Sequence, residues 1–89
     1  MRKIEQQLNK AIRARKGFKL DNTRLEWADG LGLVYLHGHH IATIDSGQAV
    51  PIPATFSAWP TRTTASRLRA LGVNATIRKG EPCIDGLAV

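Results

Sequence analysis

Cysteine, aromatic residues and long apolar runs are all scarce in this sequence. The one cysteine, Cys83, has no partner for an intramolecular disulfide, which favours a reducing compartment. No apolar run approaches the roughly 20 residues that a membrane-spanning helix needs. Residues 1–7 have a basic start, but the apolar segment of a signal peptide does not follow it. These absences predict a cytoplasmic protein without a membrane partner.

Catalytic motifs are missing as well. The sequence contains no nucleophile elbow, phosphate-binding glycine loop, paired-carboxylate site or Cys-x-x-Cys pair. Cys83 follows Pro82 in an expected strand, where a small apolar role is commoner than that of a nucleophile. We therefore predict that the protein is not an enzyme and holds no cofactor.

Three histidines lie close together, and they raise the question of a metal site. His37 and His40 are expected to share one face of a hairpin, with His39 in its turn. A zinc site normally takes three or four protein ligands, and Cys83 or Asp85 would have to come from elsewhere in the chain. We predict a solvated histidine pair and no metal.

The length and composition are those of one small globular domain. The chain has 89 residues, of which 43% are hydrophobic and 22% charged, so we assign residues 1–89 to a single domain. A core of this size gives only a few kcal/mol of net stability, roughly 3–5. A homo-oligomer is therefore possible.

The net charge of +6 is unevenly distributed along the chain. Residues 1–24 have a net charge of +6, residues 25–61 of −3 and residues 62–89 of +3. Basic ends around a mildly acidic middle favour one positive face that attracts phosphate or an acidic protein. The alternative is that the charge only keeps the protein soluble.

Two segments have the apolar spacing of helices. In residues 4–16 the apolar side chains recur at Ile4, Leu8, Ala11 and Ile12, and Gly17 suits the left-handed residue just past the end. Residues 61–71 form the second helix, capped by Thr61 or Thr63 and ended by Gly72. Trp59, which precedes the second helix, is expected to fill the space beneath that helix.

The remaining segments have the alternation of strands. Residues 33–44 predict a hairpin whose two-residue turn is Gly38-His39, so that His37 pairs with His40. Residues 22–27 precede it, and residues 49–56 follow as an outer strand because two prolines remove donors from one edge. Residues 74–78 and 82–89 form a last hairpin. The fold class is α+β, in the order α-β-β-β-β-α-β-β, with one antiparallel sheet and two helices packed mainly on one face.

Several pieces of the chain together resemble a family of small bacteriophage proteins. These pieces are Asn22-Thr23, Tyr35-Leu36-His37-Gly38 with Ile41-Ala42, the segment 59–71 and Lys79-Gly80-Glu81 with Ile84-Asp85-Gly86. The most specific part is the pattern Trp-x-Thr-x-Thr-Thr-x-Ser-Arg-Leu that begins at Trp59. The resemblance implies a phage accessory protein in the host cytoplasm, and it brings no established activity.

The basic residues then give the leading functional hypothesis. We predict a non-enzymatic module that binds nucleic acid through its phosphate backbone. The alternative is a host-takeover protein that binds and modulates a host bacterial protein. The expected contact residues on the two helices and the segment after the first are Arg62, Arg67, Arg69, Arg13, Arg15, Lys16 and Lys19. Arg67 has two alternative roles, contact with the partner or an ion pair with an acid such as Glu26.

Overall fold

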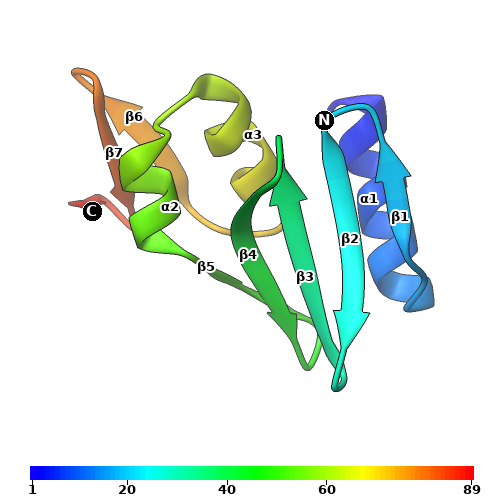
Figure 1. Ribbon diagram of the computed structural model, residues 1–89. Helices are drawn as coiled ribbons and strands as arrows, with labels where there is room; N and C mark the ends of the chain where they lie inside the picture. The colour runs from blue at the N-terminus through cyan, green and yellow to red at the C-terminus, as the bar shows by residue number, and fades with distance from the viewer.

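The computed structural model describes residues 1–89 and contains three helices and eight strands (Figure 1). The elements are α1 (Lys3–Ala14), β1 (Phe18–Leu20), β2 (Thr23–Ala28), β3 (Leu31–Leu36), β4 (His39–Asp45), β5 (Gln48–Pro51), α2 (Pro53–Ala58), α3 (Arg62–Ala70), β6 (Ala75–Arg78), β7 (Glu81–Ile84) and β8 (Leu87–Ala88). The predicted α+β class is confirmed. The strands form two antiparallel sheets, where one was expected.

The larger sheet has the strand order β1-β2-β3-β4-β5, and the smaller has β6-β7-β8. Every neighbouring pair is antiparallel and sequential in the chain. The last hairpin continues through the Asp85-Gly86 turn into β8. Its three strands form a separate sheet and do not extend the larger one. Helix α2 contacts both β4 and β7, so it lies between the two sheets.

The central hairpin turns at His37-Gly38, one residue earlier than predicted. Both residues have positive φ, 51° and 80°, which is the type I′ turn with glycine second. Leu36 therefore pairs with His39 and Tyr35 with His40, and the predicted pairing of His37 with His40 is wrong. The same non-glycine-then-glycine turn recurs at Asp29-Gly30, Ser46-Gly47, Lys79-Gly80 and Asp85-Gly86.

Strand β5 is the edge of the larger sheet, as its prolines predicted, but it ends at Pro51. Residues 53–58 form α2, so the strand predicted over residues 49–56 is wrong in its second half. Pro53 is the first residue of α2, a position where the missing amide proton costs nothing and the fixed φ suits the helix. Phe56 then becomes a core residue of α2.

Helix α1 ends earlier than predicted. Arg15 takes the left-handed conformation with φ 53°, so Gly17 does not supply it. The chain after it forms β1, which the sequence analysis did not predict. Helix α3 matches the prediction: Thr61 Oγ1 accepts a hydrogen bond from Thr64 N at 3.1 Å, and Gly72 follows with φ +95°.

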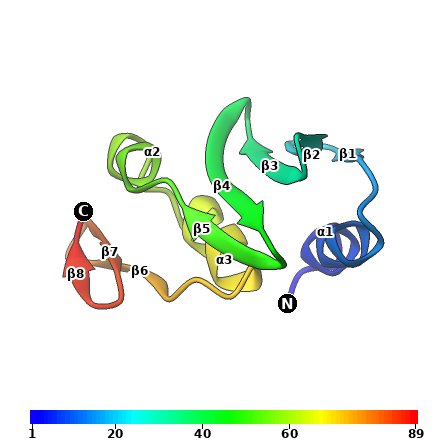
Figure 2. The same ribbon diagram turned by 90° about the horizontal axis from the view of Figure 1, so that it is seen from below.

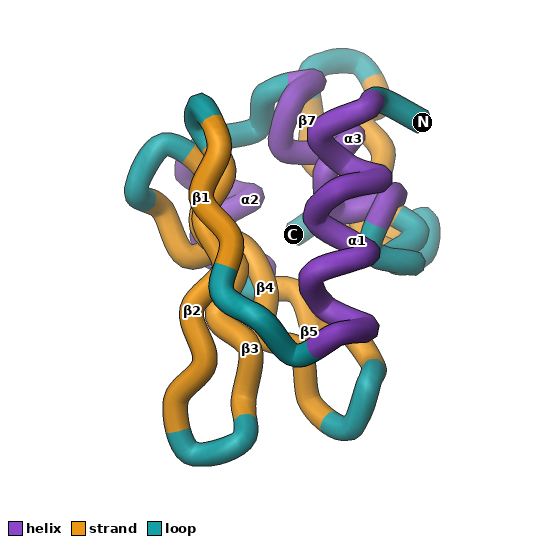
Figure 3. Tube along the Cα trace, turned by 90° about the vertical axis from the view of Figure 1, so that its right-hand side faces the viewer, coloured by secondary structure: helices purple, strands orange, loops and turns teal.

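Helices α1 and α3 lie on the same side of the larger sheet, and the opposite face of β1–β3 has no helix over it (Figures 2 and 3). The core between these layers is apolar. Its fully buried members include Leu8 of α1, Leu25, Val34 and Ile41 of the sheet, and Leu68 of α3.

Candidate functional site

A buried ion pair joins α1 to α3. Arg67 Nη1 lies 2.8 Å from Glu5 Oε2, and both residues are only 2% exposed. Two further donors hold the carboxylate, because Ser66 Oγ donates to Oε2 at 2.6 Å and the Arg2 backbone N–H donates to Oε1 at 3.1 Å. Glu5 is therefore a structural acid inside the molecule.

The rest of the Arg67 guanidinium binds the sheet. Its Nε donates to Thr23 Oγ1 at 3.1 Å and its Nη2 to Asn22 Oδ1 at 3.4 Å. A guanidinium that is buried and occupied in this way has no free face for a phosphate. The expectation that Arg67 contacts a partner is corrected, and the acid it pairs with is Glu5, not Glu26.

Glu5 stays ionised in this environment. Burial by itself raises the pKa of its carboxyl group, but the hydrogen bonds from Ser66, the Arg2 backbone and Arg67, with the Arg67 charge, outweigh it. The net effect lowers the pKa of Glu5 below its ordinary value. The pair is thus charged on both sides and neutral as a unit.

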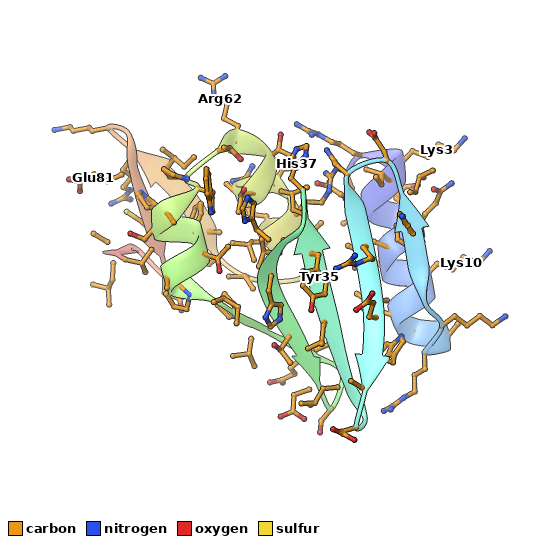
Figure 4. The ribbon with its side chains drawn as sticks, viewed as in Figure 1. Lys3, Lys10, Tyr35, His37, Arg62 and Glu81 are labelled. Carbon is orange, nitrogen blue, oxygen red and sulfur yellow. The ribbon has the colours of Figure 1, made fainter.

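The contacts between α1 and α3 show that the two helices run parallel. Glu5 meets Ser66 and Arg67, and one turn later Asn9 Nδ2 donates to the Ala70 carbonyl at 2.9 Å. Since both contacts advance in the same chain direction, the N-termini of the two helices lie at the same end of the molecule. Figure 4 shows Lys3 of α1 and Arg62 of α3 projecting from this end.

A hollow of about 610 Å³ opens beside these N-termini. Three arginines line it, Arg2, Arg62 and Arg69, and we call it the arginine hollow; its other lining residues are Ala65, Ser66, Ile77 and Gly80. Arg69 is held in place because its Nη1 donates to the Ala75 carbonyl at 3.0 Å. No carboxylate lines the hollow.

The positions of two of these arginines, Arg2 and Arg62, work against helix stability. The N-terminus of a helix carries a partial positive charge, so acids are favoured there and cations are disfavoured. Arg2 and Lys3 nevertheless occupy the start of α1, and Arg62 the first position of α3, whose first turn contains no acid. Helix chemistry does not explain these residues.

The other predicted contact residues lie elsewhere. Arg13 and Arg15 are at the C-terminal end of α1, about 17–20 Å along the helix axis from Arg2 at 1.5 Å per residue. There the helix dipole favours cations. The Arg15 guanidinium also lies 5.8 Å from the Trp27 ring centroid. Lys16 and Lys19 follow this end, Lys19 on β1. Of the seven predicted residues, the structure brings together Arg62 and Arg69.

The three histidines are spread over two faces of the sheet and a turn. His37 is in the turn, and His40 lies beside Tyr35 with its Nε2 3.1 Å from Thr43 Oγ1. His39 stacks on Trp59 instead. The expectation that His37 and His40 share a face is therefore wrong. The side chains form no group of three or more His, Cys, Asp or Glu placed to hold a metal ion.

Trp59 does not fill the space beneath α3 as predicted, because half of its surface is exposed. Its ring stacks on His39 with the centroids 4.4 Å apart and the planes inclined by 24°. A pocket of about 250 Å³, which we call the tryptophan pocket, lies beside this stack. Its lining residues are Leu36, His37, His39, Ile41, Thr55, Trp59, Thr61 and Thr64.

One protein family matches the sequence of this chain. A sequence model of the family described as Kyanoviridae Gp96 protein matches residues 1–86. The chain belongs to this family. Its members are phage proteins, so the predicted membership of a small bacteriophage family is confirmed. No curated protein and no solved structure matches the chain. None of the helices is long and apolar enough to cross a membrane.

Sequence reasoning missed two parts of the site in this phage protein. Arg2 was not predicted, although an arginine immediately before a helix that starts with lysine is unfavourable enough to be a signal. The role of Glu5 had no such signal, because its partner Arg67 is 62 residues away in the sequence. Only the packing of α1 against α3 brings the two together.

Proposed function

We propose that this phage protein is a non-enzymatic module that binds nucleic acid, and that the arginine hollow holds its phosphate groups. The observation that supports this proposal is the meeting of Arg2, Arg62 and Arg69 around one hollow without a carboxylate. Guanidinium groups bind phosphate oxygens through two parallel hydrogen bonds, with a geometry that lysine does not offer.

The surrounding electrostatics favour the same ligand. The N-termini of α1 and α3 both lie at this end, and their partial positive charges add to those of the arginines. Glu5, which accepts a hydrogen bond from the lining residue Ser66, is neutralised by Arg67. An anion in the hollow would therefore meet donors and positive charge without a competing carboxylate.

The arrangement fits a polyanion better than a single small anion. Arg62 extends from the molecule into solvent, where it can reach a neighbouring phosphate along a chain (Figure 4). All three arginines are exposed, as a surface for a long ligand requires. Phosphate contacts of this type position a nucleic acid without reading its sequence.

The experiment compares two triple variants that each remove three positive charges, one at the arginine hollow and one at and just after the C-terminal end of α1. The first replaces Arg2, Arg62 and Arg69 by Gln, and the second replaces Arg13, Lys16 and Lys19 by Gln, all of them exposed. Binding of a fluorescein-labelled single-stranded 20-mer and of the matching duplex is measured by anisotropy at low salt. Circular dichroism of each variant checks that the fold is retained.

We expect the hollow variant to lose binding by at least about tenfold more than the matched control. Equal losses in the two variants would contradict a localised site. Absence of binding to either oligonucleotide at low salt would overturn the proposal and would leave an acidic host protein as the partner that the hollow fits.

A further inference from the structure

We propose that the tryptophan pocket stacks one unpaired base of a single-stranded nucleic acid, next to the phosphates held in the arginine hollow. This inference rests on the proposed function and narrows it to strands with unpaired bases. It assigns a role to Trp59, which the core does not use.

Trp59 is available for stacking and is already oriented. Its side chain is 50% exposed, although a tryptophan in a small domain is usually mostly buried. The His39 ring, 4.4 Å away, lies against it and restrains its rotation. A base that approaches the exposed part of the indole would extend an existing stack of two rings to three.

The pocket has the size and polarity for one ring. At about 250 Å³ it is smaller than the roughly 300 Å³ at which small-molecule sites begin, so it admits a base and not a whole nucleotide. Leu36 and Ile41 give it an apolar floor. The hydroxyl groups of Thr61 and Thr64 already bond to each other at 2.8 Å. Stacking on the indole uses the face of a base, which all four bases offer, so we expect weak sequence preference.

The first turn of α3 connects the pocket to the arginine hollow. Thr61 and Thr64 line the pocket, and the neighbouring residues Arg62 and Ala65 line the hollow. The backbone N–H groups of Arg62 and Thr63 have no partner within the protein, since Thr64 N is the donor that the Thr61 cap satisfies. A strand whose base enters the pocket can therefore place its next phosphate at this helix start.

Charge favours a nucleic acid over a protein side chain in this pocket. No acid lines the pocket. The adjacent hollow adds three guanidinium groups. An apolar side chain of a protein partner would use the apolar part of the pocket and leave the positive charge of the hollow unmatched. A base linked to phosphates uses both.

The test compares single-stranded and duplex binding in Trp59→Ala, Trp59→Phe and a matched control. The control is Val50→Ala, which removes an apolar side chain of similar exposure, 52%, from the edge strand β5. The probes are a fluorescein-labelled dT 20-mer and a 20-base-pair duplex. Base–aromatic stacking is worth about 1–3 kcal/mol per base, so we expect Trp59→Ala to weaken dT binding by about 5- to 140-fold.

The expected pattern is specific to stacking. Duplex binding should stay within about twofold in Trp59→Ala, because paired bases do not reach the pocket, and Trp59→Phe should keep most of the dT affinity. Indole fluorescence should be quenched by dT in the wild type and much less in Trp59→Phe, where Trp27 alone remains. Val50→Ala should bind both probes as the wild type does.

Three results would overturn the inference, and they separate it from the proposed function. Unchanged dT binding in Trp59→Ala, with both probes still lost in the triple Gln variant of the hollow, would leave phosphate binding intact and show that Trp59 does not stack a base. Equal loss of dT and duplex binding in Trp59→Ala would show that Trp59 has a structural role and does not stack a base. No binding of either probe by the wild type overturns both proposals.

Discussion

Replacing Arg67 by Met should remove most of the stability of the protein. The variant deletes one member of a buried ion pair and leaves the Glu5 carboxylate inside the molecule without its cation. It also leaves Asn22 and Thr23 without the guanidinium donors that now reach them. Removing one partner of such a pair typically costs 3–5 kcal/mol, because the remaining charge is not compensated.

This loss is large compared with the total free energy of unfolding of the protein. A core of this size gives roughly 3–5 kcal/mol of net stability, so the expected loss is comparable with the whole free energy of unfolding. For a domain of this size 1 kcal/mol corresponds to about 4–8 °C, so the midpoint of thermal unfolding should fall by at least about 12 °C.

The assay is urea unfolding followed by circular dichroism, on a double-mutant cycle. Glu5→Leu should also be strongly destabilised, whereas Glu5→Leu with Arg67→Met should recover at least about 3 kcal/mol over either single variant, since both charges are then gone. Arg13→Met is the control and should lie within about 0.5 kcal/mol of the wild type. An Arg67→Met variant as stable as this control would refute the structural role of the pair.

Three further predictions concern stability. Because the pKa of Glu5 is lowered in the folded state, its contribution to the free energy of unfolding is present above about pH 4.3 and is lost as the pH falls through the folded pKa. Urea unfolding between pH 7 and 2.5 should therefore show that the free energy of unfolding falls more steeply in the wild type than in Glu5→Gln. Parallel curves would contradict this. Gly32→Ala should cost about 1–3 kcal/mol in the same assay, because a Cβ there would lie 3.1 Å from both the Trp27 ring and Ile44 Cβ; wild-type stability would show that the ring moves aside freely. Thr61→Ala should cost about 1 kcal/mol through loss of the α3 cap, while Thr61→Ser should cost less.

Local signals in the sequence were sufficient for elements whose chemistry is local. The Thr61 cap and Gly72 correctly predicted the start and the end of α3, and the two prolines near residue 52 correctly predicted an edge strand. The same prolines misled at α2, because proline at the start of a helix and proline in an edge strand look alike in a short segment. The central hairpin failed for a similar reason, since Gly38 suits the first position of one turn type and the second position of another.

The site depends on packing, and the sequence could predict only part of it. Arg62 and Arg69 were among the predicted residues because they are exposed positions on an amphipathic helix. Arg67 shares that helix and that charge, yet it points to the interior, where Glu5 meets it from the other end of the chain. Helical spacing places Arg67 nearer the inward side of α3 than Arg62 and Arg69. The acid that Arg67 pairs with is known only once α1 is placed beside α3.

The most direct test of nucleic-acid binding at the arginine hollow is the salt dependence of the affinity. Each phosphate contact contributes about 0.9 to the slope of log K against log salt on duplex DNA and about 0.7 on single strands. The triple Gln variant of Arg2, Arg62 and Arg69 should therefore have a slope shallower than the wild type by about 2–3 units. A wild type that does not bind at low salt, or a variant with the wild-type slope, would contradict the account.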